Sequence, residues 1–293
     1  PIGTAPPCTG TETATTAGAN HPWTDTSTNT VYFETALYHS YTTAKNAGLS
    51  KINATTNTKI KGAKVRYLAA DGGTSVYPFR FKFSANCEIV DCDLAYSRIS
   101  SVNYGPYGMG FRIEFSRECN ILNTRYVGKP DSSLYVSGKG YGFVLHGCTD
   151  CKVIGTTAIN ARHGYLLQYG AAGNEIADFH DIGSRISAID FHGINARNNH
   201  VHGGTIVGGP LVTADSTTKT AIKIGNTSHI YGDFDNLIEN ITVHNYDFTG
   251  GETGNGMQLL CQSAGNTIRN ITIYGCDYGI KLTYNSTYTS SIL

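Results

Sequence analysis

Apolar and polar residues alternate along most of the chain from residue 59 onward, with the period of two that is typical of β-strands. The clearest run is FRFKF at 79–83, in which aromatic and basic residues take turns. FRFKFSANC (79–87) aligns residue for residue with FRIEFSREC (111–119) and more loosely with FVLHGCTDC (143–151). Later copies are YLLQYGAAGN (165–174), IDFHGINARNN (189–199), IKIGNTS (222–228), MQLLCQSAGN (257–266) and IKLTYNS (280–286).

Each copy is followed by a second apolar-alternating segment that opens with Cys or Asn. The openings lie at 87, 119, 151, 174, 199, 236 and 266, so the intervals are 32, 32, 23, 25, 37 and 30 residues. Irregular repeats of this length, with two short strands each and no helical periodicity, indicate a solenoid of strands. We therefore expect an all-β chain folded as a right-handed, single-stranded parallel β-helix.

The openings of the second segment predict a column of side chains inside this coil. Stacked rungs lie about 4.8 Å apart, so equivalent residues of successive rungs are neighbours. We expect a buried column of small side chains with free thiols, continued by an Asn ladder. Its members are Cys87, Cys119, Cys151, Asn174, Asn199, Asn236 and Asn266.

The residues ahead of the repeats divide into two parts. Residues 1–29 are rich in Thr, Ala, Gly and Pro, and are expected to form a flexible leader. Residues 30–58 begin with TVYFETALYHSYTTAKNAGL, whose apolar residues fall at helical spacing. We expect a short helix here that caps the open end of the coil, followed by a linker, with the β-helix occupying residues 59–293.

Composition narrows the classes of partner. The chain has 22 basic and 22 acidic residues, so no overall charge favours nucleic acid. It has no apolar run long enough to insert into a membrane. Cys148 and Cys151 have CxxC spacing, but Cys151 belongs to the buried column and no second pair follows. No metal and no other cofactor is expected.

Rung length predicts the place of a site. The rungs that open at Cys151 and Asn174 are short, whereas long loops are expected near 95–110, 127–142 and 207–221. This arrangement would leave a groove whose floor runs from Arg162 to His192. Asp190 and His192 share the outward face of one strand, and Arg162 and His163 precede the strand of the previous rung. These four residues are the candidate catalytic groups.

A groove with a carboxylate, imidazoles and guanidinium groups suits an elongated sugar polymer, and two chemistries fit it. A hydrolase needs a pair of carboxyl groups, which Asp190 could form with Asp178, Asp181 or Glu114. A lyase needs a base for the C5 proton of a uronic acid and a cation for its carboxylate, as His163 or His192 with Arg162 or Arg185 would provide. The candidate substrate-binding residues are His146, Arg185, Glu114, Arg112 and Lys223.

The same carboxylates could have a structural role instead of a catalytic one. Lys223 is expected one rung from Asp190, and Lys82 one rung from Glu114, so each carboxylate has a cation for a surface ion pair. A non-catalytic β-helix that only binds glycan or serves as a structural element therefore remains an alternative.

The pair RHGYLL (162–167) and IDFHG (189–193) resembles motifs of the pectate-lyase-like β-helices in tailed-phage tail spikes and pre-neck appendages. The resemblance implies an extracellular, homotrimeric virion protein of the phage tail. Such a protein attaches to the host cell and binds, and often cleaves, a capsule, lipopolysaccharide or wall teichoic acid. It marks Asp190, His192, Arg162 and His163. A second resemblance, to alginate C5-epimerases and lyases, is weaker because DFHG (190–193) lacks the Pro and the final acid of their motif, and the two motifs come in the opposite order.

Overall fold

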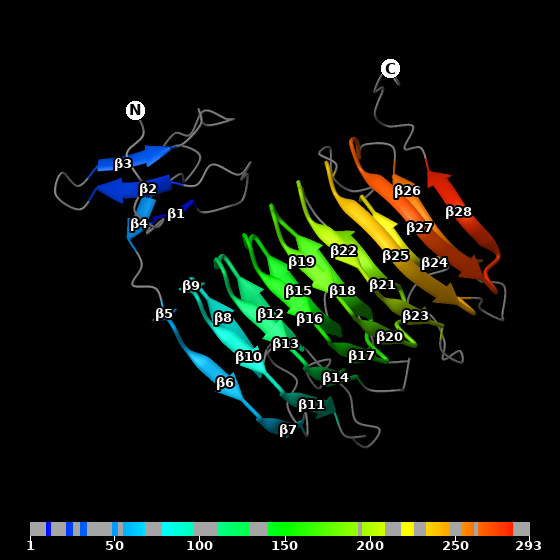
Figure 1. Cartoon of the computed structure of the whole chain (residues 1–293), viewed down its shortest axis with the longest axis horizontal. Coiled ribbons are helices and arrows are strands. Elements are labelled where there is room, and N and C mark those ends of the chain that lie inside the picture. The colour runs from blue at the N-terminus through cyan, green and yellow to red at the C-terminus, as the bar shows by residue number, and fades with distance from the viewer. Residues whose placement is uncertain are drawn as a thin grey trace, which may run out of the picture.

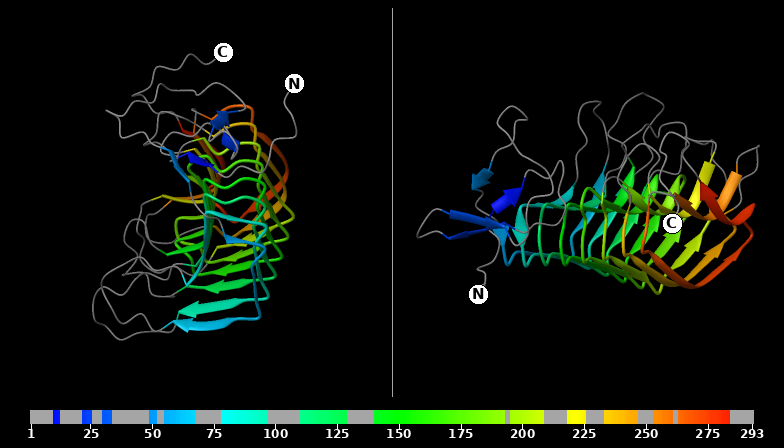
Figure 2. Two further views of the ribbon diagram at one scale, coloured as in Figure 1. Left: turned by 90° about the vertical axis from the view of Figure 1, so that its left-hand side faces the viewer. Right: turned by 90° about the horizontal axis from the view of Figure 1, so that it is seen from above.

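The computed structural model describes side chains for residues 55–65, 78–95, 110–128, 140–192, 195–208, 219–225, 233–246, 254–259 and 263–283. It also gives the backbone of strands at 10–12, 22–25, 30–33 and 49–51 and of strand ends next to the described ranges. From residue 55 onward, the chain coils into stacked rungs of parallel strands, which confirms the predicted parallel β-helix (Figure 1). Figure 2 shows the same stacked rungs from two further directions.

Strands of successive rungs form three parallel columns. The first column comprises β6 (Lys59–Lys61), β10 (Glu88–Val90), β13 (Asn120–Leu122), β16 (Lys152–Ile154), β19 (Glu175–Ala177) and β22 (His200–His202). The second comprises β7 (Lys64–Tyr67), β11 (Asp93–Tyr96), β14 (Arg125–Val127), β17 (Thr157–Ile159), β20 (His180–Ile182) and β23 (Thr205–Val207). The longer strands β25 (Leu237–His244) and β27 (Thr267–Tyr274) continue both columns, which joins them into one 14-stranded sheet.

The third column is a separate 8-stranded sheet that carries the candidate site. Its strands are β8 (Phe79–Lys82), β12 (Phe111–Glu114), β15 (Tyr141–His146), β18 (His163–Gln168), β21 (Ser187–His192), β24 (Thr218–Ile224), β26 (Thr253–Leu260) and β28 (Tyr278–Thr283). A short pair, β5 (Thr55–Thr56) and β9 (Ser84–Ala85), begins a further column at a corner of the coil.

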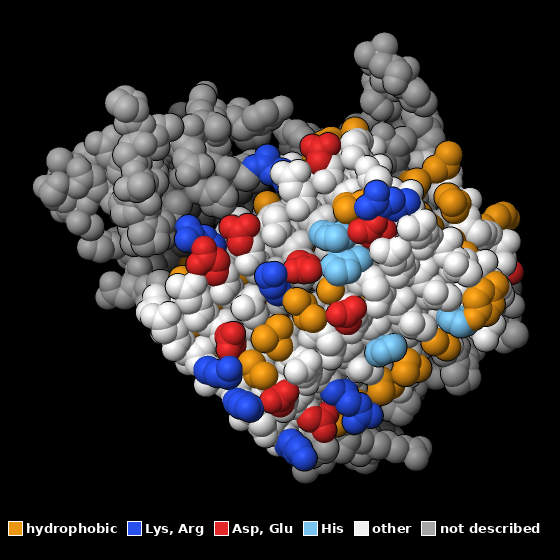
Figure 3. Space-filling view, viewed as in Figure 1, with side chains coloured by type: hydrophobic (Ala, Val, Ile, Leu, Met, Phe, Trp, Pro, Cys, Tyr) orange, Lys and Arg blue, Asp and Glu red, His pale blue; other side chains and the backbone are white. Residues whose placement is uncertain are grey.

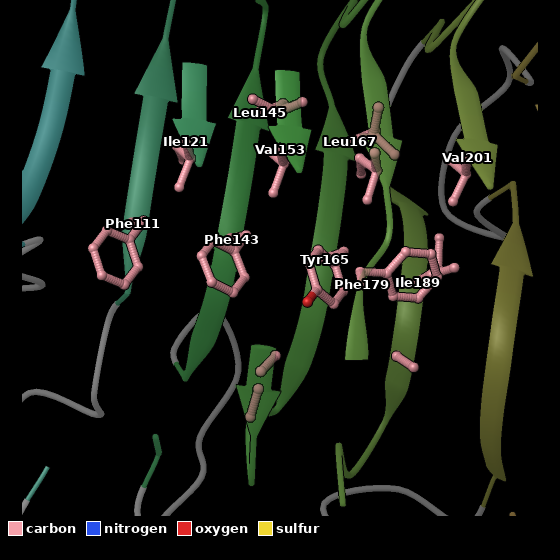
Figure 4. Packing of buried hydrophobic residues seen from close by; sticks show 14 of the residues in the cluster. Phe111, Ile121, Phe143, Leu145, Val153, Tyr165, Leu167, Phe179, Ile189 and Val201 are labelled. Carbon is pink, nitrogen blue, oxygen red and sulfur yellow. The ribbon is translucent and has the colours of Figure 1, made fainter. Parts of the chain in front are cut away.

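The core fills the space between the two sheets. In the 8-stranded sheet, Phe111, Phe143 and Tyr165 form one row (Figure 4). Phe79 occupies the same register position, and all four residues are buried in the core. Their rings stack with centroids 4.8–5.3 Å apart, close to the spacing of the rungs. Ile121 and Val153 of the facing sheet lie among the same cluster. The alternation that predicts strands therefore also places the core.

The predicted Cys and Asn column lies at a corner of the coil. Cys87, Cys119 and Cys151 are buried free thiols, as expected. Beyond them, Asn174, Asn199 and Asn236 each donate two hydrogen bonds, from the backbone N–H and from Nδ2, to Oδ1 of the Asn in the next rung, at 2.9–3.0 Å. This Asn ladder satisfies buried polar groups at a turn that no strand pairing covers.

Replacing Asn199 by Ala should lower the free energy of unfolding by about 2–3 kcal/mol, because the buried backbone N–H of Asn174 loses its acceptor and its side-chain amide loses one. The carbonyl of Ala171 loses one of its two donors and keeps the backbone N–H of Arg197. The midpoint of urea denaturation measures the effect. Asn120→Ala, at a half-buried position of β13, is the control and should change stability by less than about 0.5 kcal/mol. Equal losses in the two variants would contradict a structural role for the ladder.

The outward face of the 14-stranded sheet carries paired charges, and Figure 3 shows basic and acidic side chains lying next to one another on it. Lys152 Nζ lies 2.9 Å from Glu175, and Arg269 Nε lies 2.5 Å from Glu239. His202 and His200 bind the same two carboxylates, and their rings stack 4.0 Å apart. These side chains form ion pairs and hydrogen bonds with one another across rungs, so the charges on this face are balanced by neighbours in the same sheet.

The structure differs from the sequence-based prediction near the N-terminus. Thr30–Phe33, the start of the expected capping helix, forms β3 and pairs antiparallel with β2 (Pro22–Asp25). At these four residues the helix prediction is wrong, because Val31, Tyr32 and Phe33 favour a strand once a partner is present. Residues 34–48 lie outside the described residues. Within the expected leader, β1 (Gly10–Glu12) pairs antiparallel with β4 (Leu49–Lys51).

In the part of the chain that the structure describes, no helix is long and apolar enough to cross a lipid bilayer.

Candidate functional site

Four side chains from two neighbouring strands meet at Asp190, on the outer side of the 8-stranded sheet. Strands β18 and β21 pair in register, so that His163 lies beside Ser187 and Gln168 beside His192. Asp190 Oδ2 lies 3.0 Å from His163 Nδ1, 3.3 Å from His192 Nδ1 and 3.2 Å from Ser187 Oγ. We call this group of Ser187, Asp190, His163 and His192 the Asp190 cluster.

Asp190 is fully buried, yet the cluster keeps it ionised. Burial by itself would raise the pKa of its carboxyl group. The charge of Lys223 in the next rung and the hydrogen bonds from His163 and His192 outweigh burial, and hold the pKa well below its usual value. The cluster therefore contains a buried negative charge that two imidazoles share.

His163 is a neutral imidazole whose proton is on Nδ1. Its burial lowers its pKa to about 4, even though the charge of Asp190 acts in the opposite direction. Arg162 Nη1 lies 3.2 Å from His163 Nε2, and a guanidinium can only donate, so Nε2 accepts. Nδ1 then carries the proton and donates toward Ser187 Oγ at 2.6 Å and Asp190 Oδ2. His163 and Ser187 thus hold the carboxylate in place.

His192 is the member of the cluster that reaches the surface. Its side chain is 29% exposed, whereas those of His163 and Asp190 are 3% and 0% exposed. Because Nδ1 donates to the carboxylate of Asp190, the lone pair of the neutral ring is on Nε2, on the opposite side of the imidazole. An imidazole held in this way by a buried carboxylate is suited to accept a proton from a bound ligand.

A second polar group lies on the first rungs of the same sheet. Glu114 is buried and forms ion pairs with Arg80, with Lys82 at 3.6 Å and with Arg112 at 3.1 Å. Burial would raise the pKa of Glu114, but these cations lower it below the usual value. The expected ion pair between Glu114 and Lys82 is confirmed, and it belongs to a group of three cations around one carboxylate.

His146 lies between the two groups. Its Nδ1 is 2.8 Å from the amide nitrogen of Gln168, which follows it in the next rung. Burial lowers the pKa of His146 to about 4, and the charge of Arg112 acts in the same direction. His146 is half-buried, so one edge of a neutral ring remains at the surface.

The structure brings the four candidate catalytic residues together but corrects the expected exposure of the site. The predicted groove floor carries an exposed carboxylate, whereas Asp190 is sealed beneath its neighbours. Arg185, a candidate for substrate binding, is buried in the turn before β21. Lys223 lies in register with Asp190, but the direct partners of Asp190 are His163, His192 and Ser187. Most residues of the expected long loops lie outside the described residues.

None of the expected partner carboxylates lies beside Asp190. Asp178 is exposed at a turn, and Asp181 points into the core from the 14-stranded sheet. Glu114 is three rungs away from His192 along its outward column, which corresponds to about 14 Å. Pairs of glycosidase carboxyl groups lie about 5–9.5 Å apart, so Asp190 and Glu114 do not form such a pair.

The sequence analysis missed Ser187 and the covered state of the cluster. Ser187 lies three residues before Asp190, in a stretch with no distinctive motif. The sequence contains one sign that Asp190 is covered. Val144 and Leu166, which precede Asp190 in the same outward column, are apolar. With Tyr141 they form a small buried cluster outside the main core. Apolar residues at outward positions of a solenoid indicate that something covers that part of the surface.

A hollow of about 500 Å³ lies at a different corner, among turn and strand residues between Asn57 and Asn120, and it includes no member of the Asp190 cluster. Among the described residues, no group of three or more His, Cys, Asp or Glu side chains is arranged to hold a metal ion.

The fold and the site define a parallel β-helix protein that carries a carboxylate–imidazole pair on one outer face. No family model and no curated protein matches the sequence. Among solved structures, the chain is similar to a mutant tailspike protein of E. coli bacteriophage HK620 in complex with a pentasaccharide. The identity is 12% and the TM-score 0.47, over 80% of this chain and 48% of that chain.

A double mutant of the HK620 tailspike protein, also in complex with pentasaccharide, is similar at 10% identity with a TM-score of 0.31. That similarity covers 79% of this chain and 53% of the tailspike chain. The chain spans about half the length of both.

Proposed function

We propose that this protein binds a bacterial cell-surface polysaccharide and cleaves it, with His192 as the base. One observation carries the proposal: the buried, ionised Asp190 holds His192 by Nδ1, so that the proton-accepting Nε2 faces away from the cluster on a partly exposed ring. Charge on Asp190 also stabilises the imidazolium that forms when His192 takes up a proton. The cluster thus has a base and its orienting group on one rigid sheet.

Elimination fits these groups better than hydrolysis by two carboxyl groups. In elimination, His192 Nε2 removes the C5 proton of a uronic acid, and the electron pair forms a C4–C5 double bond. The C4–O bond to the next sugar breaks, and the leaving oxygen takes a proton from water. Arg162, half-buried beside His163, provides a guanidinium close to the cluster for the carboxylate of the sugar.

The proposed setting is the tail spike or a similar appendage of a bacteriophage, outside the cell, with the chain as a homotrimer. The motifs RHGYLL and IDFHG support this setting through their resemblance to such β-helices. The proposed partner is a capsule, lipopolysaccharide or wall teichoic acid of the host.

A second candidate function is glycan binding without cleavage. The full burial of Asp190 and the near-complete burial of Gln168 beside His192 favour it, because a covered cluster can serve to hold the sheet surface rigid for recognition. In that case His192 contributes only a hydrogen bond to a sugar hydroxyl.

Incubation of the protein with purified surface glycans separates the two functions. Size-exclusion chromatography should show shorter fragments, and absorbance at the ultraviolet edge should rise as the unsaturated product forms. Fragments without new absorbance would replace elimination by hydrolysis. Stable binding of a glycan that keeps its full length would support binding without cleavage and exclude the proposed cleavage.

A further inference from the structure

Three aromatic residues of the 8-stranded sheet adopt a backbone conformation that bulky side chains rarely take. Phe83, Phe115 and Tyr169 have φ values of 53°, 46° and 52°. Among the described residues, every other non-glycine residue with positive φ is Asn or Asp, apart from Glu118. Asn and Asp tolerate this region, whereas a bulky residue there is strained. We call Phe83, Phe115 and Tyr169 the aromatic column.

The aromatic column follows the ends of β8, β12 and β18, so its members occupy equivalent positions in their rungs. Gly147 occupies the position between Phe115 and Tyr169. A Cβ on Gly147 would lie 2.7 Å from the ring of Phe115, so the glycine leaves room for that ring. Phe83 and Phe115 stack at 5.7 Å, and His146 contacts both Phe115 and Tyr169 at 4.9 and 4.8 Å.

The aromatic column does not serve the core. Its three residues are half-buried, and none of them belongs to the buried cluster between the sheets. Packing inside the coil therefore does not explain why aromatic side chains replace the Asn and Asp of other turns. A row of half-exposed rings along a coil is a surface on which planar or weakly polar faces of a ligand can stack.

Cations line the aromatic column on its strand side. Arg80 and Lys82 are 42% and 40% exposed, and the buried Glu114 binds both. Lys82 Nζ lies 4.8 Å from the centre of the Phe83 ring. One carboxylate thus holds two exposed cations, of which Lys82 lies beside the rings. The two cations and the one carboxylate leave a net positive charge, to which Arg112 adds.

This surface is in register with the Asp190 cluster. Lys82, Glu114, His146, Gln168 and His192 occupy one outward column of the sheet, in register from rung to rung. Four steps between rungs correspond to about 19 Å, enough for several sugar residues. Lys82 is exposed and His146 and His192 are half-buried, whereas Gln168 between the two histidines is buried. A glycan bound at His192 that follows the coil axis would pass over Gln168 and His146 to the aromatic column.

We infer that the aromatic column with Arg80 and Lys82 is a subsite for an anionic sugar residue, which stacks on Phe83 and Phe115 while the two cations bind its carboxylate or phosphate. The inference rests on the proposed function and specifies its substrate as an acidic glycan. It assigns recognition to the first rungs of the sheet and the reaction to the rung of His192.

An array of purified bacterial glycans tests the inference. It contains carboxylate-bearing capsules, phosphate-bearing wall teichoic acids and neutral O-chains, and binding of the whole chain is measured at two salt concentrations. We expect binding to acidic glycans only, weaker at the higher salt concentration. Comparing the carboxylate-bearing with the phosphate-bearing glycans identifies which anionic group the subsite binds. Equal binding of acidic and neutral glycans at both salt concentrations would overturn the inference and leave the proposed function standing, whereas no binding to any glycan would overturn both.

Variants then locate the subsite on the glycan found. Arg80→Gln with Lys82→Gln should weaken binding about tenfold or more, and Phe115→Asn about tenfold. Asn suits the backbone of residue 115, so circular dichroism should show the fold retained, and Phe115→Tyr should restore binding. The matched control is Lys152→Gln with Arg269→Gln, which removes the same charge from the 14-stranded sheet. Acidic glycans bound equally by the control and test variants would place the subsite elsewhere.

Discussion

Replacing Asp190 by Asn should lower the kcat of glycan cleavage by roughly 10³–10⁴-fold with little change in KM. Asp190 Oδ2 accepts hydrogen bonds from Nδ1 of both His163 and His192, which leaves Nε2 of His192 as the base. A neutral amide removes the charge that stabilises the imidazolium of His192, and its NH₂ group can turn the ring to the wrong tautomer. The reaction loses its base while the sugar-binding surface stays in place.

The measurement is steady-state cleavage of the glycan, followed by absorbance or by reducing ends. Asp181→Asn is the matched control, since it is the same change at another fully buried Asp that points into the core. It should cleave at the rate of the unchanged protein. His192→Gln should lose activity to the same extent as Asp190→Asn, and the double variant should be no worse, because the two residues act as a unit. Full activity in Asp190→Asn would remove the assigned chemistry.

Much of the fold follows from the sequence because the coil repeats. Alternation within FRFKF and its copies assigns inward and outward residues, and the register between Asp190 and Lys223 or between Glu114 and Lys82 was obtained by alignment alone. The Cys and Asn column is equally regular, since a buried turn needs small or amide side chains at each rung. The N-terminal strands have no such repeat, and the helical spacing of apolar residues led to the prediction of a helix at Thr30–Phe33, which form β3.

The site was less predictable because its chemistry depends on side-chain contacts between rungs. Alignment brings Arg162, His163, Asp190 and His192 together, but it does not reveal that Asp190 is covered or that Ser187 binds it. The protonation of His163 depends on Arg162 reaching back to Nε2, which no residue pattern specifies. The aromatic column was not predicted, because the positive φ of Phe83, Phe115 and Tyr169 is known only from the backbone of the folded coil.

Asp181 accounts for the glycine of the RHG motif. Its carboxyl group points into the core, where a Cβ on Gly164 would lie 1.8 Å from Asp181 Oδ2. The same oxygen accepts a hydrogen bond from Ser184 Oγ at 2.7 Å. Burial raises the pKa of Asp181 to about 7, although the hydrogen bonds from Ser184 act in the opposite direction. In the folded protein this side chain is therefore a neutral acid below about pH 7.

Replacing Asp181 by Asn should stabilise the protein at alkaline pH, by up to about 4 kcal/mol. The pKa of Asp181 is higher in the folded state than in the unfolded state, so its contribution is fully present below about pH 4. The contribution falls as pH rises toward 7, because folding then has to keep a proton that the unfolded chain releases. Asn stays neutral, so the variant and the unchanged protein should differ little at pH 4 and increasingly up to about pH 7.

Urea denaturation from pH 4 to pH 9 measures this difference. Asp178→Asn is the matched control, because Asp178 is exposed and its φ of 50° suits Asn equally well. Its stability should follow that of the unchanged protein at every pH. Some loss of unfolding free energy at alkaline pH should remain in Asp181→Asn, since burial also raises the pKa of Asp233 to about 8. If the free energy of unfolding of Asp181→Asn and of the unchanged protein varied with pH in the same way, Asp181 would not hold its proton in the folded coil. The carboxyl group under Gly164 would then be ionised and stabilised by contacts other than Ser184.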